Sequence, residues 1–569
     1  MSSRDFLKKT WIDIILVLGV AGLLWGLFLV GHEWFGNVHE KIIINLTPAS
    51  LPGYTLLSLT RGMLAYSLSL GFTLIYAYWA AKHKPSGVVL VPLLDILQSI
   101  PVLGFMPALV VGLIAVFPQS MIGLELAAVL MIFTGQAWNM TFSFYRSLTS
   151  VPTDQNEAAR AFHFSWWQRL RWVELPSATT GLVWNSMMSM AGGWFFLMLS
   201  ETFVLGEHDY RLPGLGSYMQ EALTQGDWLA MGWGVLAMVL MIVLLDQLLW
   251  RPLVVWAERF RVEDSAAAVA QESWFLDLLH NSRLVRWCTD FAARKKYRAP
   301  KMAIVGDDLV AVWGPRIAWL AFSLLIAGLA WGAWRLMGLL VQVPLVAVGS
   351  ANDASWWAIV SSTGLTAARV VGSLVLGTMW ALPVGLAIGR SPTWSRRMQP
   401  VVQVAASFPA PMLFPLFLML FHLVGLPLGT GAMILMLLGT QWYILFNVIA
   451  GAQAIPSDLR EATSAFRMTS WQRFRNLEAP AVLPALVIGW VTAAGGAWNA
   501  SIVAEYLSWK GTIYATDGLG AIISRAAAAA DYPILAASVT CMAVTVALIN
   551  IICWRPLRAL AHDRYTLTN

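Results

Sequence analysis

The residues with the greatest chemical potential lie in two polar loops that repeat one another. Residues 157–176 read EAARAFHFSWWQRLRWVELP, and residues 461–480 read EATSAFRMTSWQRFRNLEAP. Ten of the twenty aligned positions are identical, including two glutamates and two arginines. Ionised groups of both signs can form strong hydrogen bonds with a partner protein. The repeated arginines have two readings, as anchors at anionic headgroups or as partners of Glu174 and Glu478.

No set of residues in the sequence is arranged for catalysis. The chain contains no GxxxxGK[ST] phosphate loop, no HExxH pair and no Ser/His/Asp arrangement. Its three cysteines, Cys288, Cys541 and Cys553, are too few and too scattered for a disulfide framework or a metal site. We therefore expect a non-enzymatic protein with no cofactor or metal of its own.

The composition is that of a membrane protein. Of the 569 residues, 58% are hydrophobic and 12% are charged, and the mean hydropathy is +0.65. Soluble domains are about one quarter charged, so this chain belongs in a lipid bilayer. The net charge of +6 comes from bases in short loops at helix ends. That placement follows the positive-inside rule and predicts no nucleic-acid partner.

The hydropathy pattern predicts an all-α polytopic membrane protein with about twelve transmembrane helices. In the first half we expect spans near residues 11–30, 56–81, 88–117, 121–148, 178–204 and 228–256, the third of them broken by prolines. A second set begins near residues 317–340. We read 11–30 as a retained helix, since no small-residue cleavage site follows it.

The second half copies the first. Leu59-Thr60 matches Leu365-Thr366 at an offset of 306, Pro101 and Pro107 match Pro409 and Pro415 at 308, and the polar loops match at 304. Six spans per half give both halves the same orientation, so the repeats are parallel, about an axis along the membrane normal. Both termini and the centre of the chain then lie on one side.

Three segments follow from this pattern. They are a first half (1–256), a linker (257–310) and a second half (311–569). Within the linker, apolar residues from Trp274 to Phe291 recur at helical spacing between basic flanks. This predicts an amphipathic helix that lies in the membrane interface or packs on a neighbouring helix.

Polar residues inside the apolar spans are candidates for a path between the halves. The candidates are Gln136, Trp138, Asn139, Asn185, Glu201, Gln441, Trp442, Asn447, Asn499 and Glu505. Each of them has the alternative role of a hydrogen bond between helices. No lysine or arginine lies plainly in mid-span, so helix N-termini, indoles and amides would have to bind an anion.

The repeated loop resembles the EAA motif of bacterial ABC importer permeases. That motif reads Glu-Ala-Ala, three residues, Gly, nine residues, a hydrophobic residue, one further residue and Pro. Glu157-Ala158-Ala159 and Glu461-Ala462-Thr463 match its start, and Pro176 and Pro480 match its end. His163 and Arg467 replace the glycine, so we expect a wider turn there.

The resemblance implies a type I ABC importer-like permease fold, with two permease domains fused in one chain. Trp-Gln-Arg and Gly192-Gly193-Trp194 look like the nitrate/sulfonate/taurine branch, whose permeases usually are separate half-size chains. It implies import of a small anionic solute such as nitrate, sulfonate or taurine across the bacterial inner membrane, with cytoplasmic termini. ATP and Mg would be bound by two copies of a partner ATPase, and a periplasmic solute-binding protein is a further candidate partner.

The resemblance also assigns the residues that would contact the ATPase subunits. They are Glu157, Ala158, Ala159, Phe162 and His163 in the first loop, and Glu461, Ala462, Thr463, Phe466 and Arg467 in the second.

Two other classes of protein fit parts of the pattern. An ion-coupled secondary transporter of the major facilitator type also has twelve spans in parallel halves. The segment Ala81-Lys82-His83-Lys84-Pro85 lacks the Gly-x-x-x-Asp-Arg signature of that family. A membrane scaffold without transport activity would have no need for two docking loops.

Overall fold

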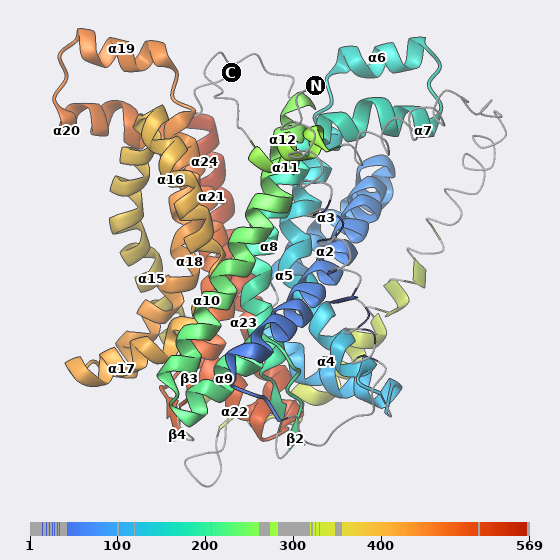
Figure 1. The fold of residues 1–569 in the computed structure, drawn as a ribbon, viewed down its shortest axis with the longest axis vertical. Coiled ribbons are helices and arrows are strands. Elements are labelled where there is room, and N and C mark those ends of the chain that lie inside the picture. Colours follow the sequence, from blue (N-terminus) through green and yellow to red (C-terminus); the bar gives the residue numbers. More distant parts are fainter. Residues whose placement is uncertain are drawn as a thin grey trace.

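The protein is an elongated bundle of helices with two looped extensions at one end (Figure 1). The computed structural model describes residues 43–99, 102–118, 120–205, 208–260, 273–282, 330–346, 355–509 and 512–565. It also describes scattered positions between 14 and 34 and between 319 and 328. The end that carries the extensions is called the loop end below.

The helices of the first half follow one another in a regular order. They are η1 (Pro48–Ser50), α2 (Leu51–Lys82), α3 (Lys84–Ser99), α4 (Val102–Val116), α5 (Ile122–Thr149), α6 (Thr153–Ala161), α7 (Trp166–Arg169), η2 (Leu170–Glu174), α8 (Leu175–Glu201), α9 (Leu215–Gln225), α10 (Trp228–Leu245), η3 (Asp246–Trp250), α11 (Arg251–Ala257), η4 (Glu258–Phe260) and α12 (Trp274–Asn281).

The helices of the second half repeat this order. They are α15 (Trp356–Arg390), α16 (Pro392–Ser407), η5 (Ala410–Leu413), α17 (Phe414–Val424), α18 (Leu428–Gln453), α19 (Ser457–Ala465), α20 (Ser470–Arg473), η6 (Phe474–Glu478), α21 (Ala479–Ala504), α22 (Leu519–Ala528), α23 (Tyr532–Ile549), η7 (Asn550–Trp554) and α24 (Arg555–Tyr565). Of the short helices, η2, η3, η6 and η7 are π-helical turns.

Each half also contains one short antiparallel hairpin at the end opposite the loops. Strand β1 (Val204–Leu205) pairs with β2 (His208–Asp209), and β3 (Tyr506–Trp509) pairs with β4 (Thr512–Ala515). In register, Leu205 faces His208, and Trp509 faces Thr512. Apart from these hairpins the described fold is helical, as the sequence predicts.

Eight described helices are long and apolar enough to cross a membrane, and a ninth span results if one bent pair counts as a single crossing. The predicted first span of the first half (11–30) lies largely outside the described residues. Most of its counterpart, 317–340, is described and helical, with an apolar stretch over Ile326–Leu340. The predicted third span is divided in both halves. In the first half it becomes α3 and α4, and in the second the chain bends by 82° between Val401–Ser407 and Ala410–Val424.

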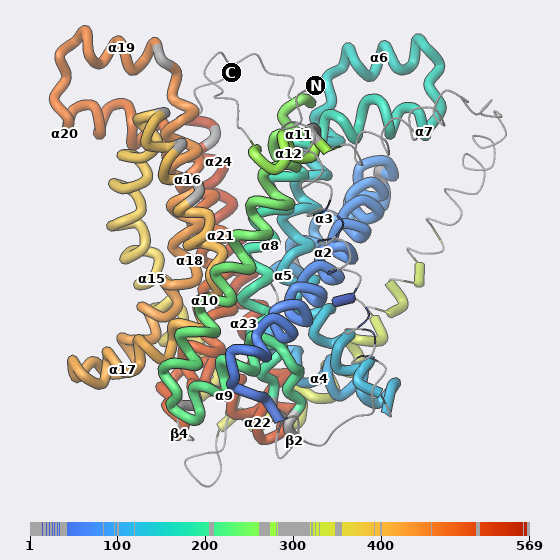
Figure 2. The backbone as a smooth tube through the Cα atoms, in the orientation of Figure 1, coloured from blue at the N-terminus to red at the C-terminus, as the bar shows by residue number. Residues whose placement is uncertain are grey.

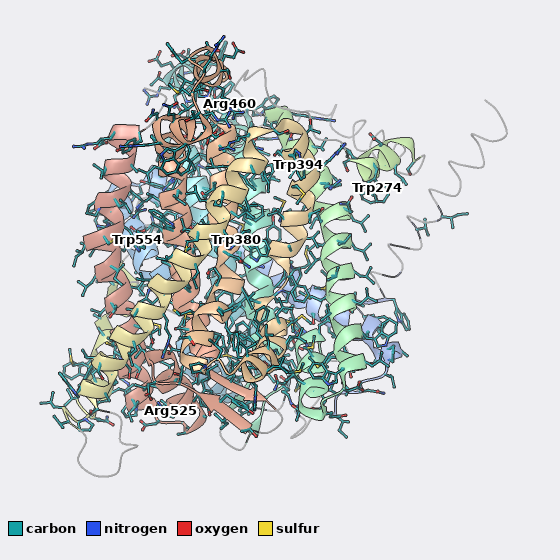
Figure 3. The ribbon with its side chains drawn as sticks, turned by 90° about the vertical axis from the view of Figure 1, so that its left-hand side faces the viewer. Trp274, Trp380, Trp394, Arg460, Arg525 and Trp554 are labelled. Atoms are coloured by element: carbon teal, nitrogen blue, oxygen red, sulfur yellow. The ribbon has the colours of Figure 1, made fainter. Side chains whose placement is uncertain are left out.

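The two halves have the same orientation. Within each, a central helix packs between two others, α5 between α2 and α8, and α18 between α15 and α21. Figure 2 shows α6–α7 and α19–α20 at the same end, with the two halves side by side. In Figure 3, Arg460 marks the loop end and Arg525 the opposite end, while Trp380 and Trp554 lie on the shaft between them.

The register between α2 and α15 differs from the predicted offset of 306. Helices α3 and α16 begin and end 308 residues apart, at Lys84 and Pro392 and at Ser99 and Ser407. The buried contacts of α2 and α15 keep the same spacing, because Ser58 and Thr366 each accept a backbone N–H from α9 or α22. The predicted offset was wrong because it matched apolar letters, which are interchangeable along a lipid-facing helix.

The divided third spans join the halves. Helix α4 contacts α21, α22 and α23, while α16 contacts α8 and α10. The backbone N–H of Val102 at the start of α4 donates to Asn499 Oδ1 of α21 over 2.9 Å. Each half therefore packs its third span against the other half.

Only part of the 257–310 linker is described. Ser273 caps α12 by accepting from the Leu276 N–H, and Trp274 Nε1 donates to Gln247 Oε1 over 3.0 Å. This contact places α12 against the π-turn η3, although the Trp274 side chain is still about half exposed. The rest of the predicted amphipathic helix, as far as Phe291, lies outside the described residues.

An arginine, Arg61, is completely buried in α2 within a predicted span, although the sequence shows no lysine or arginine plainly in mid-span. Arg61 Nε and Nη2 donate to Glu125 over 2.6 and 2.7 Å, and Nη1 donates to Glu201 Oε1 over 2.8 Å. Glu201 also accepts from Ser58 Oγ and from the Gly216 N–H. This dense bonding satisfies charges that would be very costly in an apolar interior.

The second half contains a lighter version of this cluster. Arg369 Nη1 donates to Glu505 Oε1 over 2.7 Å, and Glu505 accepts from Thr366 and from the Gly520 N–H. At the position equivalent to Glu125 stands Gly429, whose carbonyl accepts from Arg369 Nε over 3.0 Å. Arg369 is thus matched to one carboxylate, whereas Arg61 is matched to two.

The repeated Gly-Leu-Gly segments, 214–216 and 518–520, make these clusters possible. A Cβ on Gly214 would lie 2.3 Å from Glu201 Cδ, and one on Gly518 would lie 2.2 Å from Glu505 Oε2. Only glycine allows the backbone to approach the buried carboxylates so closely. Asp227 and Asp531, which also repeat, cap the next helices by accepting backbone N–H groups of α10 and α23.

Replacing Arg61 with leucine should destabilise the protein more than the same change at Arg369. Arg61→Leu leaves two buried carboxylates without their cation, and breaking such a cluster costs about 3–5 kcal/mol. Denaturant unfolding of the purified protein in detergent measures the difference. Adding Glu125→Gln and Glu201→Gln to Arg61→Leu should recover part of the loss. Equal stability of Arg61→Leu and the parent would contradict this account.

Candidate functional site

The two repeated loops fold into matching pairs of short helices. The first loop contains α6 and α7, and the second contains α19 and α20, both at the loop end of the bundle (Figure 1). A capping box begins each second helix. Ser165 pairs reciprocally with the backbone and side chain of Gln168, and Thr469 pairs in the same way with Gln472. The Ser/Thr-x-x-Gln spacing is a sequence signal for these helix starts.

The turn between the two helices of each loop is tight, so the expected wider turn was wrong. His163 and Arg467 have left-handed backbone conformations, with φ of 49° and 50°. The Phe164 N–H donates to the Ala159 carbonyl, and the Met468 N–H donates to the Thr463 carbonyl, which closes a Schellman turn. Both residues therefore occupy the conformation that glycine adopts without strain, at a cost of about 1–2 kcal/mol each.

Buried glutamates tie the loops to the bundle. Glu174 Oε1 lies 2.5 Å from Lys82 Nζ at the end of α2 and 3.0 Å from Arg169 Nε. In the second half, Glu478 binds Arg390 at the end of α15 over 2.5 and 2.8 Å, and Arg473 Nε lies 3.1 Å away. The predicted pairing within the loops thus involves Arg169 and Arg473. Lys82 and Arg390, in the last turns of α2 and α15, supply the link to the bundle.

The predicted docking residues mostly face outward. Glu157, Ala158, Phe162 and His163 are exposed in the first loop, as are Glu461, Phe466 and Arg467 in the second. The third position of the motif, Ala159 or Thr463, is buried in both loops. Ala462, at the second position of the second loop, is half-buried. Phe162 and Phe466 are 74% and 76% exposed, which is unusual for a large aromatic side chain next to charged groups. Exposed apolar groups with a polar rim are typical of protein-binding surfaces.

A cavity of about 150 Å³ lies between the two halves. It is lined by residues of α3, α4, α5 and α8 from the first half and of α16, η5, α18 and α21 from the second. Its described lining contains no charged side chain. The lining polar and indole groups belong to Gln98, Thr134, Trp138, Asn139, Gln403, Thr440, Trp442, Tyr443, Thr492 and Asn499.

Four predicted path residues line this cavity. They are Trp138 and Asn139 on α5, Trp442 on α18 and Asn499 on α21. Trp138 and Trp442 hold equivalent positions in the two halves. The sequence analysis missed Gln98 and Gln403 because they lie on the divided third spans, whose approach to the other half leaves no mark in a single sequence.

The other six predicted path residues lie outside the cavity lining. Glu201 and Glu505 belong to the buried arginine clusters. Asn185 donates to Ser143 Oγ and to the Gly181 carbonyl, and Asn447 donates to the Tyr443 carbonyl. Gln136 is buried beside Ser69 and Met190, and Gln441 is half-buried.

The cavity is not symmetric, although the fold around it is. Asn139 of the first half corresponds to Tyr443 of the second, and Phe195 corresponds to Asn499. At each of these two positions, one half therefore contributes an aromatic side chain and the other half contributes an amide. A dimer of identical chains has to present the same residues twice and could not form this asymmetric lining.

Fold and site together define a class: a multi-pass membrane protein made of two parallel helical repeats, each with an exposed helical loop at one end and a share of a central cavity. Residues 71–249 and again residues 373–558 match the family described as binding-protein-dependent transport system inner membrane component. The matches cover more than half of the chain, so it belongs to this family. The protein is an ABC importer permease with two permease domains. Family membership removes the major facilitator alternative.

Similar curated proteins are permease proteins of several transport systems. The nitrate import permease protein NrtB of Synechococcus elongatus is 28% identical over 145 residues, 26% of this chain and 50% of the relative. The bicarbonate transport system permease protein CmpB of Synechocystis is 27% identical over 167 residues, 29% and 56% of the two chains. The glycine betaine/proline betaine permease ProW of Escherichia coli is 25% identical over 161 residues, 28% and 43%.

The chain thus spans about half the length of the relatives it matches. Because those relatives are named for nitrate, bicarbonate and betaines, similarity alone does not single out a solute. The choice among solutes has to come from the residues of this chain.

Glycine at the two strained turns should stabilise the loops. His163→Gly and Arg467→Gly remove the penalty of a left-handed residue with a side chain, so each should raise the unfolding free energy by about 1 kcal/mol. Thermal unfolding in detergent measures the change. His163→Ala keeps the Cβ and serves as the control, which should show no gain. A loss of stability in both glycine variants would show that the side chains, rather than the turn, matter.

Proposed function

We propose that this chain forms the translocation path of an ATP-driven importer in the bacterial inner membrane. Its two repeated loops dock two copies of a separate ATPase, which supply ATP and Mg. The observation that carries the proposal is the duplicated loop: two tight, exposed helical pairs at one end of the bundle, each tied by a buried glutamate to the helix that flanks the path. The docking end is then cytoplasmic, and so are both termini.

The contacts of each loop support transmission of force. Glu174 joins the first loop to α2, and α2 is joined again to α8 by the Arg61 cluster at its far end. A push on α6 and α7 therefore reaches helices that line the cavity without passing through a flexible segment. A partner surface could contact the exposed apolar side chains of Phe162 and Phe466. It could also form ion pairs with Glu157 and Glu461.

The cavity is suited to a small solute that binds to uncharged hydrogen-bond donors. Amides, hydroxyls and indole N–H groups are able to bind an anion such as nitrate or a sulfonate, or the sulfonate end of taurine, without the desolvation cost of a buried lysine or arginine. The family description names a binding-protein-dependent system, which supports delivery of the solute by a periplasmic solute-binding protein. In this proposal that protein docks at the end of the bundle opposite the loop end.

Reversing the charge of both docking glutamates should uncouple the ATPase. Glu157→Lys with Glu461→Lys should still insert in the membrane, since both side chains are exposed, while copurification of the ATPase or solute-stimulated ATP hydrolysis falls at least about tenfold, the effect of 1.4 kcal/mol. Because the loops differ at His163/Arg467 and Ala159/Thr463, the single variants should be unequally affected. Normal coupling in the double variant would contradict the docking assignment.

Transport assays identify the solute. Proteoliposomes with the reconstituted ATPase should take up nitrate, taurine or a sulfonate only with ATP, and bicarbonate and glycine betaine serve as comparison solutes. Uptake that continues without ATP and follows a proton gradient would contradict the proposal.

A further inference from the structure

Each divided third span starts its second helix at the wall of the cavity, but the two helix starts are not equivalent. In the first half, the Val102 N–H at the start of α4 donates to Asn499 Oδ1 over 2.9 Å. Ala410, the equivalent of Val102, also lines the cavity and begins the helix Ala410–Val424. Its N–H donates to no residue in the part of the chain that the structure describes. One helix start is therefore capped, and the other is free.

The sequence explains why only one start is capped. Asn499 caps α4 from the opposite half, and its equivalent on α8 is Phe195, whose side chain has no hydrogen-bond acceptor. The chain bends by 82° before Ala410, and Figure 1 shows α17 turned outward from α16. The partial positive charge of this helix start is thus left at the cavity wall. Free N–H groups at helix starts favour anions.

A glutamine on the same divided span also lacks a partner. Gln403 of α16 lines the cavity, and only 9% of its surface is exposed. No described residue forms a hydrogen bond with its amide, although buried polar side chains are almost always paired. The other unpaired amides of the lining, Gln98 and Asn139, are half-buried, so water reaches them more easily. The Gln403 amide is therefore a buried group whose partner has to come from a cavity.

A solute that pairs with Gln403 has room only in the central cavity. Gln403 also borders a second cavity, together with Trp194 and Asp246, but the volume there is only about 10 Å³. That is no more than the space of one water molecule. The central cavity, with about 150 Å³, can hold a small solute.

Tyr443 brings a further hydrogen-bond donor across the cavity. A Cβ on Gly496, in the same half as Tyr443, would lie 3.5 Å from Tyr443 Cε2. A Cβ on Gly192, in the first half, would lie 3.3 Å from Tyr443 Oη. The two equivalent glycines thus make room for the ring and for the hydroxyl. Within the described ranges this hydroxyl has no hydrogen-bond partner, and Asn139, the equivalent residue, has a shorter side chain.

The threonines of the lining differ from Tyr443 in this respect. Thr134, Thr440 and Thr492 each donate to a backbone carbonyl of their own helix, over 2.7, 2.9 and 3.0 Å. Their hydroxyl protons are therefore already used, whereas that of Tyr443 is available to a solute.

We propose that Ala410, Gln403 and Tyr443 form a binding subsite for one small oxyanion, on the second-half side of the cavity. The inference rests on the proposed function and narrows its solute class to anions that carry a nitrate-like or sulfonate group. The Ala410 N–H, the Gln403 amide and the Tyr443 hydroxyl each donate a hydrogen bond to an oxygen of the solute. The described lining contains no carboxylate that would repel it.

The first half does not repeat this subsite. The counterpart of Ala410 is Val102, whose N–H is already bound, and the counterpart of Gln403 is Asp95, which lies outside the described lining. The cavity therefore holds one oxyanion rather than two. Because all three donors are uncharged, they bind the anion less tightly than an arginine or lysine would, which allows the solute to leave.

Equilibrium binding tests the subsite without requiring transport. The full chain in nanodiscs of zwitterionic lipid is incubated with radiolabelled methanesulfonate, and nitrate serves as the competitor. The parent should bind one methanesulfonate per chain, and nitrate should displace it. Absence of binding, or binding of two anions per chain, would overturn the proposal. Displacement by tetramethylammonium but not by nitrate would also overturn it, because it would indicate a cation site among the aromatic side chains.

Substitutions test the assignment of each group. Gln403→Leu and Tyr443→Phe each remove one uncharged donor and should weaken binding about fivefold. Phe195→Asn supplies the cap that the Ala410 N–H lacks, and should weaken binding by a similar factor. Gln441→Leu removes a half-buried amide outside the lining and is the matched control, with unchanged affinity. Parental affinity in both Gln403→Leu and Tyr443→Phe would refute the subsite. ATPase copurification checks that each variant is folded.

Uptake by the reconstituted complex separates the inference from the proposed function. Methanesulfonate binding without ATP-driven uptake by the parent would sustain the subsite and refute ATP-driven import. ATP-driven anion uptake that is unchanged in the double variant Gln403→Leu/Tyr443→Phe would sustain the importer and refute the subsite.

Discussion

A single helix in each half carries a buried glutamate at both of its ends, and the rest of the structure depends on how those glutamates are bound. Glu174 and Glu201 bracket α8, while Glu478 and Glu505 bracket α21. Their cations come from one neighbouring helix. Lys82 and Arg61 lie on α2, and Arg390 and Arg369 lie on α15. Two ion pairs thus fix each pair of helices at both ends. The Arg61 and Arg369 pairs are buried, so they are very costly to separate, because each partner would be left as an unpaired charge.

This constraint gives the loops and the cavity a mechanical relation. The glutamate at the loop end is the last residue of a π-turn, η2 or η6, and π-turns are frequent at functional sites. In the proposed mechanism, motion of a loop is delivered to the helix that lines the cavity and to the helix fixed beside it. The divided third spans pack against the opposite half. In this mechanism a shift of one half therefore also changes the cavity wall that it presents to the other half.

The sequence predicts the fold and the loops well because both are repeated. The duplicated polar segment can be recognised from its repeated sequence alone. The fold class follows from the length of the apolar segments. Arg61 and Glu201 are different, since their partnership joins residues 140 apart and looks like two unrelated polar interruptions in apolar runs. The register of α2 against α15 was misjudged for the same reason: leucines match at many offsets, whereas Ser58, Arg61 and Lys82 match at one. Trp138, Asn139, Trp442 and Asn499 were found by polarity within spans, but polarity could not separate them from Asn185 or Asn447, whose bonds are internal to the bundle.

Fusion of the halves has allowed them to diverge where a dimer of identical chains cannot. Glu125 corresponds to Gly429, Asn139 to Tyr443 and Asp246 to Asn550, so the side chains lack the symmetry of the backbone. The central claim is that one such chain provides both halves of the path and both docking sites. Native mass spectrometry of the complex purified through this 62.6 kDa chain tests it directly. The account predicts one copy of this chain with two copies of the ATPase. A complex with two copies of this chain, or with a single ATPase, would contradict it.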